Sequence, residues 1–170
     1  MRLVVLGFAA VFIVAGLVMG AVGFTARGEV TQALVDERLK VPNPQVLLTY
    51  PGARAPEGVE VPTVLIDTPE LAVAQAKVIQ THTLAITGGK TYSEMDREDP
   101  ARATSLTAVT LRSALMQARL GFDISLLVMG LGALFVLSGT AIGVIYLVSR
   151  RRVAAQDVVV AQRVPAPSPA

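Results

Sequence analysis

The 170-residue sequence contains no cysteine and only one histidine, His82. The absence of cysteine excludes disulfide bonds, thiolate nucleophiles and thiolate metal sites. A single imidazole excludes any site within one chain that needs two histidines, such as an iron site built from two histidines and a carboxylate. From this inventory we expect neither a metal ion nor a cofactor.

Charged residues are also scarce: they make up 16% of the chain, against 52% hydrophobic residues, and the mean hydropathy is +0.57. Soluble domains usually carry about 25% charged residues. A chain of this length forms one modest domain at most. The composition therefore predicts that part of the chain contacts lipid rather than water.

The hydrophobic excess lies in two uncharged runs, Leu3 to Phe24 with 22 residues and Ile124 to Val148 with 25 residues. A helix of the shorter length measures about 33 Å, which exceeds the roughly 30 Å of a bilayer core. The alternative for the first run is a cleaved signal peptide, whose apolar core has only about 7 to 15 residues. The alternative for the second is a buried core helix, which a domain this small cannot surround. Both runs are predicted to span a membrane.

Basic residues adjoin both runs: Arg2 precedes the first, and Arg150, Arg151 and Arg152 follow the second. Because basic residues near span ends stay in the cytoplasm, both termini are predicted to be cytoplasmic and residues 25–123 extracytoplasmic, in the cell membrane. That extracytoplasmic segment holds ten lysines and arginines against twelve aspartates and glutamates, a net charge of −2. The positive surplus belongs to the cytoplasmic ends, so nucleic-acid binding is not predicted.

Between the spans, Glu29–Lys40 has a helical pattern that extends the first span outward and ends before a proline. Two runs rich in aliphatic and β-branched residues, Gln45–Tyr50 and Val59–Ile66, are predicted as short extended segments, and a β-hairpin would pair them. Pro62 in the second run would confine it to a sheet edge.

Two further helices follow. The first is predicted from Pro69 to Ile86, because Thr68 can cap it and proline suits a first turn, and Gly88 and Gly89 would end it. The second is predicted from Pro100 to Ser149 as one uninterrupted helix that includes the second span.

The expected fold is mainly α: a two-helix transmembrane hairpin carries an extracytoplasmic three-helix bundle, with the short β-hairpin attached. The expected parts are transmembrane helix 1 (1–27), the extracytoplasmic helical domain (28–122), transmembrane helix 2 (123–149) and a basic, proline- and alanine-rich cytoplasmic tail (150–170). The tail after Arg152 is predicted to be disordered, because its composition cannot bury a core.

His82 is the candidate for a pH-sensitive interaction, since it is the one side chain expected to titrate near neutrality. Leu71 and Val78 share its predicted helix face, which makes a packed or interface histidine the simpler interpretation.

Acidic residues gather in the segment YSEMDREDP; they are Glu94, Asp96, Glu98 and Asp99. The central glycine and distal glutamate of a calcium loop are missing here. We expect these acids to decorate a helix N-terminus, where negative charge is favourable. A weak divalent-cation or partner-docking site is the alternative.

Two glycine motifs complete the candidates. The segment TGGKT at residues 87–91 shares its last residues with a phosphate-binding loop, but that loop needs glycine where this chain has Leu84, and a helix end is predicted instead. Pairs of glycine at GxxxG spacing let helix backbones approach in membranes. These predicted helix-packing residues are Gly16, Gly20, Gly139 and Gly143.

The segment HTLAITGGKTYSEMDREDPAR, followed by an apolar span and an arginine-rich end, resembles small two-span membrane proteins of high-GC actinobacteria. The resemblance covers most of the chain. It implies a membrane location and brings no particular activity with it.

The predicted function is that of a non-enzymatic integral membrane protein whose exterior domain binds protein, as an accessory or scaffolding subunit or as a homo-oligomer. Neither predicted span contains an ionisable residue, which argues against a transporter or a proton-driven pump. One alternative is an exterior-facing, membrane-anchored hydrolase that uses His82 and nearby carboxylates. Another is a membrane sensor that acts through a partner protein.

Overall fold

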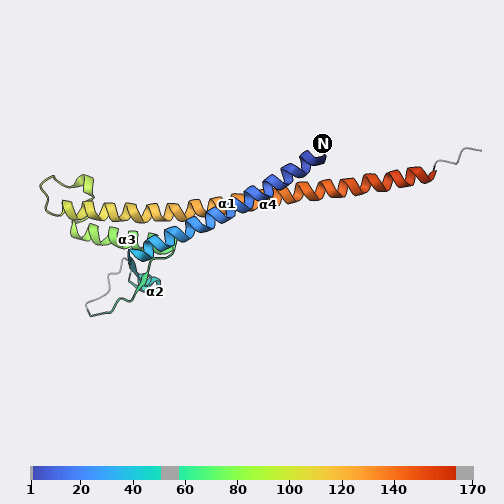
Figure 1. The fold of residues 1–170 in the computed structure, drawn as a ribbon. Helices are drawn as coiled ribbons and strands as arrows, with labels where there is room; N and C mark the ends of the chain where they lie inside the picture. The colour runs from blue at the N-terminus through green and yellow to red at the C-terminus, as the bar shows by residue number, and fades with distance from the viewer. Residues whose placement is uncertain (1, 51–57, 164–170) are drawn as a thin grey trace, which may run out of the picture. The chain divides into compact units, whose positions relative to one another are not determined.

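The computed structural model describes residues 2–50 and 58–163, and side chains within 3–50 and 58–152. In chain order its elements are α1 (Arg2–Asp36), β1 (Lys40–Pro42), α2 (Pro44–Thr49), β2 (Thr63–Leu65), α3 (Pro69–Ile86), the 3-10 helix η2 (Tyr92–Glu94) and α4 (Arg102–Arg163) (Figure 1). The described chain is thus mainly helical, as expected, with one small sheet. It divides into two compact units, and both α1 and α4 contribute to each of them.

The first unit joins α1 as far as Val22 to α4 from Val128 onward. Its two helices meet at glycines. A Cβ atom added at Gly132 would lie 2.6 Å from the carbonyl oxygen of Gly16, which is shorter than real Cβ contacts. A Cβ atom at Gly139 would lie 2.7 Å from the carbonyl oxygen of Ala9. The two backbones therefore approach too closely at these points to admit a side chain.

Large apolar side chains of the first unit lie mostly on its outside. The most exposed include Leu3, Phe8, Leu17, Leu134 and Leu137, each at least 60% exposed. Phe12 and Phe135 instead contact each other edge to face, with ring centroids 5.2 Å apart. The stretches Leu3–Asp36 and Arg102–Arg152 are both long and apolar enough to cross a membrane.

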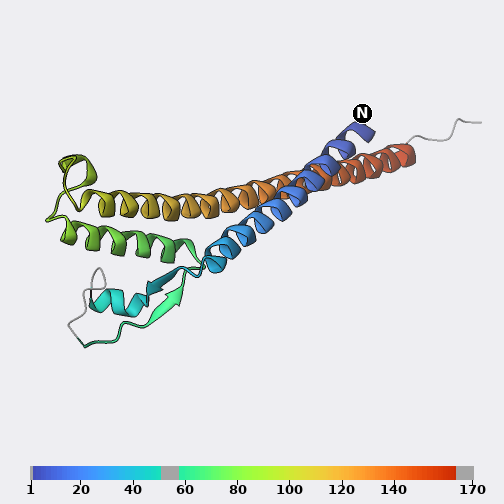
Figure 2. The same ribbon diagram turned by 60° about the vertical axis from the view of Figure 1, so that its left-hand side comes forward.

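The second unit, Gly23–Leu127, packs the end of α1, all of α3 and the first part of α4 around one core. Figure 1 and Figure 2 both show α3 running beside this part of α4. The buried core residues are Leu34, Val41, Ile66, Ala72, Ala76, Leu115 and Phe122. Helices from three places in the sequence therefore share one core, to which the small sheet adds Val41 and the residue after its second strand adds Ile66.

The sheet is a two-stranded antiparallel ladder in which Val41 of β1 lies opposite Val64 of β2 (Figure 2). The N–H of Ile66 donates a hydrogen bond to the carbonyl oxygen of Leu39 at 2.9 Å, just beyond the ladder. Val41 and Ile66 have no exposed surface. The ladder thus closes over the end of the core by placing one apolar side chain from each strand region into it.

The expected first strand, Gln45–Tyr50, is wrong, because α2 occupies Pro44–Thr49. Asn43 caps this helix: its Oδ1 accepts a hydrogen bond from the N–H of Gln45 at 2.9 Å, and Pro44 takes the first turn. The strand that pairs with Thr63–Leu65 is Lys40–Pro42 instead.

The predicted helix from Pro69 to Ile86 is confirmed as α3. Thr68 Oγ1 accepts a hydrogen bond from the N–H of Leu71 at 3.4 Å, which caps the N-terminus. At the other end Gly88 and Gly89 have positive φ angles of 61° and 88°. This left-handed backbone favours glycine, so the TGGKT segment is a helix C-terminus, as predicted.

Two helix ends differ from expectation. α1 ends at Asp36 rather than Lys40, and Arg38 follows with a positive φ of 51°. α4 continues to Arg163, so the expected disorder is wrong for residues 153–163, while residues 164–170 lie outside the described chain. Between Pro100 and Pro165 the sequence has no proline, and nothing there breaks the helix.

Candidate functional site

His82 lies exposed on α3. The buried residues of the helix are Ala72, Ala76 and Val78, so the predicted face is packed at Val78 but not at His82. His82 is therefore not packed in the core of this chain, and an interface histidine stays a prediction. Among the described residues His82 forms no ion pair with the acidic segment.

The four acidic residues lie between α3 and α4, and their local contacts differ from one residue to the next. Glu94 closes a capping box with Thr91 at η2. Asp99 accepts a hydrogen bond from the N–H of Ala101 at 2.9 Å, just before α4 begins. Asp96 and Glu98 are exposed. No group of three or more acidic or histidine side chains among the described residues could hold a metal ion.

The pKa of Glu94 is lowered, and the cause is local. Its Oε2 accepts hydrogen bonds from the backbone N–H of Thr91 at 2.8 Å and from the Thr91 hydroxyl at 2.7 Å. These bonds favour the charged carboxylate and lower the pKa of Glu94 below its ordinary value, with a further contribution from Lys90.

The predicted helix-packing glycines divide into two groups. Gly16 and Gly139 lie in the close contact within the first unit, and the backbone nitrogen of Gly20 is 2.8 Å from a Cβ added at Gly132. Gly20 and Gly143 themselves have open space where a side chain would project. Gly132 was not among the predicted residues.

The predicted topology residues Arg150, Arg151 and Arg152 are exposed on α4. Arg2 belongs to α1, but its side chain lies outside the described part of the structure.

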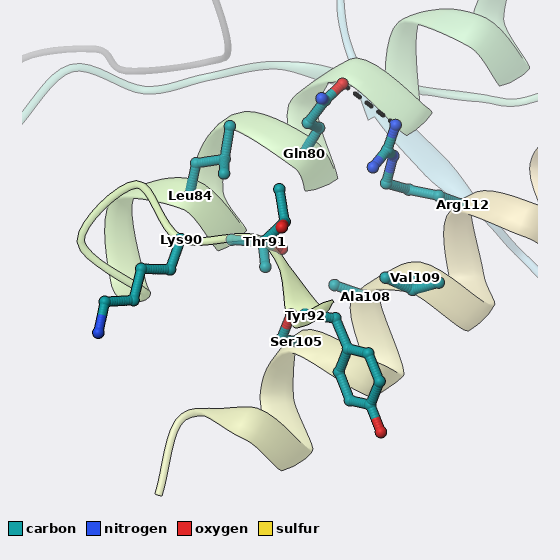
Figure 3. A pocket seen from close by; sticks show the side chains of 10 residues that line it. Gln80, Leu84, Lys90, Thr91, Tyr92, Ser105, Ala108, Val109 and Arg112 are labelled. Atoms are coloured by element: carbon teal, nitrogen blue, oxygen red, sulfur yellow. Dashed lines mark hydrogen bonds between the residues drawn. The ribbon is translucent and has the colours of Figure 1, made fainter. Parts of the chain in front are cut away.

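A pocket of about 60 Å³ lies between α3 and α4 in the second unit (Figure 3). Leu84 of α3 and Ala108 and Val109 of α4 supply apolar walls. The segment that follows α3 contributes Thr91 and Tyr92. The pocket thus combines two helices with the turn that connects them.

Two basic residues line the pocket, Arg112 and Lys90. Arg112 of α4 donates a hydrogen bond from Nη2 to Oε1 of Gln80 on α3 at 3.2 Å (Figure 3). Its Nε atom is buried and has no hydrogen-bond partner among the described residues. Lys90 also lines the pocket, but Figure 3 shows its side chain extending away from it.

Arg102 fixes the wall formed by Tyr92. Its guanidinium lies over the Tyr92 ring, 4.2 Å from the centroid, and donates to the carbonyl oxygens of Met95 at 2.6 Å and Tyr92 at 3.4 Å. These three contacts hold the connecting segment against the start of α4.

A row of apolar side chains on α4 faces solvent beside this pocket. Leu106, Val109, Met116 and Leu120 recur at helical spacing and are 40 to 56% exposed. We call this row the α4 apolar stripe. An exposed apolar row of this kind is typical of a binding face in proteins.

Comparison with known proteins finds no matching family model, no matching curated protein and no matching solved structure. The function therefore has to be inferred from the residues and their arrangement.

Proposed function

We propose that the chain is a non-enzymatic integral membrane protein whose second unit binds a protein partner outside the cytoplasm. It acts as an accessory or scaffolding subunit of a membrane assembly, or as a homo-oligomer. The proposal extends the finding that two helices are long and apolar enough to cross a membrane.

The proposed topology has both termini in the cytoplasm and residues 25–123 outside. It is supported by the three arginines that follow the apolar part of α4 and by the net charge of −2 between the spans, from ten basic and twelve acidic residues. A reporter fused after Lys40 tests this topology, because its activity shows on which side of the membrane that residue lies. A cytosolic reporter would overturn the topology.

The α4 apolar stripe is the observation that supports partner binding. Leu106 is 50% exposed and Leu120 is 56% exposed, although the second unit buries Phe122 and Leu115 on the other side of the same helix. Because large apolar side chains in water favour association, a helix with a packed face and a second apolar face is suited to a protein contact.

Purification of the full chain in mild detergent, followed by native mass analysis, tests the proposal. We expect a homo-oligomer or a stoichiometric partner. Met116→Glu places a charge in the stripe and should dissociate the complex. Ala114→Glu adds the same charge at an exposed position of α4 outside the stripe and should leave it intact.

Two results would contradict the proposal: a stable monomer without a co-purifying protein, or equal association of the two variants. Circular dichroism of both variants checks that the helices remain folded, since both substitutions are at exposed sites and should leave the core unchanged.

A further inference from the structure

The α4 apolar stripe continues to the end of the second unit. Ile124 and Leu127, which are 50% and 62% exposed, follow Leu120 at intervals of four and three residues. Such intervals keep side chains on one face of an α-helix. The row from Leu106 to Leu127 is therefore about six turns long, with the small polar side chain of Ser113 within it. We call this row the extended stripe.

The place where the extended stripe ends restricts what can cover it. Ile124 begins the uncharged run that is proposed to cross the membrane, and Leu127 lies within that run. A soluble protein could cover the outer turns, but the bilayer would keep it from the last one. A partner that follows the whole stripe must itself enter the membrane beside α4. A second copy of this chain meets that condition, because its own α4 enters at the same residue.

The two edges of the extended stripe differ in charge. Arg112 lies along the edge that faces α3, where it donates a hydrogen bond to Gln80 at 3.2 Å. Arg119 follows seven residues later on the same edge. The other edge carries Thr110 and Gln117, which are uncharged and exposed. One edge is therefore basic and the other is neutral and polar.

This difference favours a parallel arrangement of two copies. Parallel helices related by a twofold axis bring opposite edges together, as in a parallel coiled coil, so Arg112 of one copy lies near Gln117 of the other. Antiparallel helices would bring the two basic edges together. Among the described residues Arg119 pairs with Asp123 at 3.3 Å, whereas Arg112 has no ion pair. Opposed arginines without carboxylates repel, so the parallel arrangement is the favourable one.

We infer that the partner of the α4 apolar stripe is a second copy of this chain, whose α4 packs in parallel and in register along the extended stripe. Each side chain of the stripe then lies beside its own counterpart, because the twofold axis runs along the stripe. This inference rests on the proposed topology and partner binding, and it names the partner and its orientation.

Single cysteines test the arrangement, because the chain has none of its own. Ser113→Cys places a thiol in the extended stripe, and a disulfide forms only between residues whose Cα atoms lie within about 7 Å. Oxidation of the full chain in membrane vesicles with copper phenanthroline should convert most of this variant to a covalent dimer. Ala114→Cys is the matched control, because it is also exposed but lies about 100° around the helix. It should give about tenfold less dimer.

Substitutions at the neutral edge test the orientation in the Ser113→Cys background. Gln117→Glu offers a carboxylate to Arg112 of the other copy and should strengthen dimerisation in detergent by about two- to fivefold. Gln117→Lys brings like charges together and should weaken it by a similar factor. Equal effects of the two substitutions would overturn the parallel arrangement. Circular dichroism shows whether each variant is folded.

The crosslinking results also separate this inference from the proposed function. A covalent dimer at residue 113, with little at residue 114, supports the second copy. Equal yields at both positions, or none at either, overturn it. If no dimer forms but a different membrane protein co-purifies and Met116→Glu releases it, the proposed partner binding stands and the second copy is wrong. A monomer without any partner contradicts both.

Discussion

The helices of the two units make contact in different ways. In the first unit Leu17 and Leu134 lie on the outside and glycines form the contact between helices. In the second unit Phe122 and Ile66 are buried, and the contact is filled by side chains. The same two helices, α1 and α4, take part in both arrangements.

This difference in packing indicates which solvent, lipid or water, suits each unit. In lipid, burying an apolar side chain gains little, because the surroundings are apolar too, and helices associate by close backbone packing at small residues. In water the hydrophobic effect drives large apolar side chains inward. The first unit follows the lipid pattern and the second follows the water pattern.

The largest effect is expected at the core of the second unit. Phe122→Ala should lower the free energy of unfolding by about 3 to 5 kcal/mol, because it leaves a cavity where an aromatic ring was 1% exposed. Leu120→Ala, two residues away and 56% exposed, should cost less than about 0.5 kcal/mol. Denaturant unfolding followed by circular dichroism measures both. Equal losses in the free energy of unfolding would show that the second unit lacks a packed hydrophobic core.

A charge on the outside of each unit separates the two solvents. Leu134→Arg, in the proposed second span, should cost about 2.5 to 3.5 kcal/mol of membrane insertion. Leu111→Arg, at a 48% exposed position in the second unit, should have little effect, since water solvates the charge. The inserted fraction after carbonate extraction is the measurement. Full insertion of the Leu134→Arg chain would refute lipid as the solvent of that face.

The glycine contact should tolerate no side chain. Gly132→Val would place its Cβ 2.6 Å from the Gly16 carbonyl oxygen and should destabilise the helix pair by about 1 to 3 kcal/mol. Gly130→Val, on the same helix with open space around it, is the control for helix propensity. Resistance to unfolding in dodecyl sulfate compares them. The glycine contact is not needed if both variants unfold alike.

The smallest effect is expected from pH at the capping box. Because its pKa is lowered in the folded chain, Glu94 contributes stability above its ordinary pKa of 4.5, and that contribution is lost as the pH falls through the folded value. Glu94→Gln should remove this slight acid dependence of the melting temperature, while Asp96→Asn should retain it. The capping bonds would be irrelevant if Glu94→Gln left the acid limb of the melting curve unchanged.

Local signals in the sequence predicted the helices well. The capping threonine and first-turn proline at residues 68 and 69 give the start of α3, and the paired glycines give its end, because both depend on neighbours in the chain. The Asn43 cap before Pro44 was an equally local signal for α2. The apolar run after it favoured a strand instead, and six residues are too few for periodicity to separate the two.

The candidate pocket could not be predicted, because it depends on the register between α3 and α4. Gln80 and Arg112 are 32 residues apart and meet only when the two helices pack. Arg112 has no motif around it, and the orphaned Nε atom that makes it a candidate is visible only after folding. His82 and the acidic segment were predicted as candidates from their residue types. Within the described chain, folding does not bring them into an ion pair.

Arg38 lies in the turn that ends α1. Its φ of 51° puts a bulky residue in a region that usually costs it about 1 to 2 kcal/mol and that glycine enters freely. The burial of Val41, three residues later and without exposed surface, offsets this conformational cost. The packing of Val41 therefore fixes the backbone conformation with which the chain leaves α1. Arg38→Gly should make the second unit more stable, because glycine adopts a positive φ without this cost.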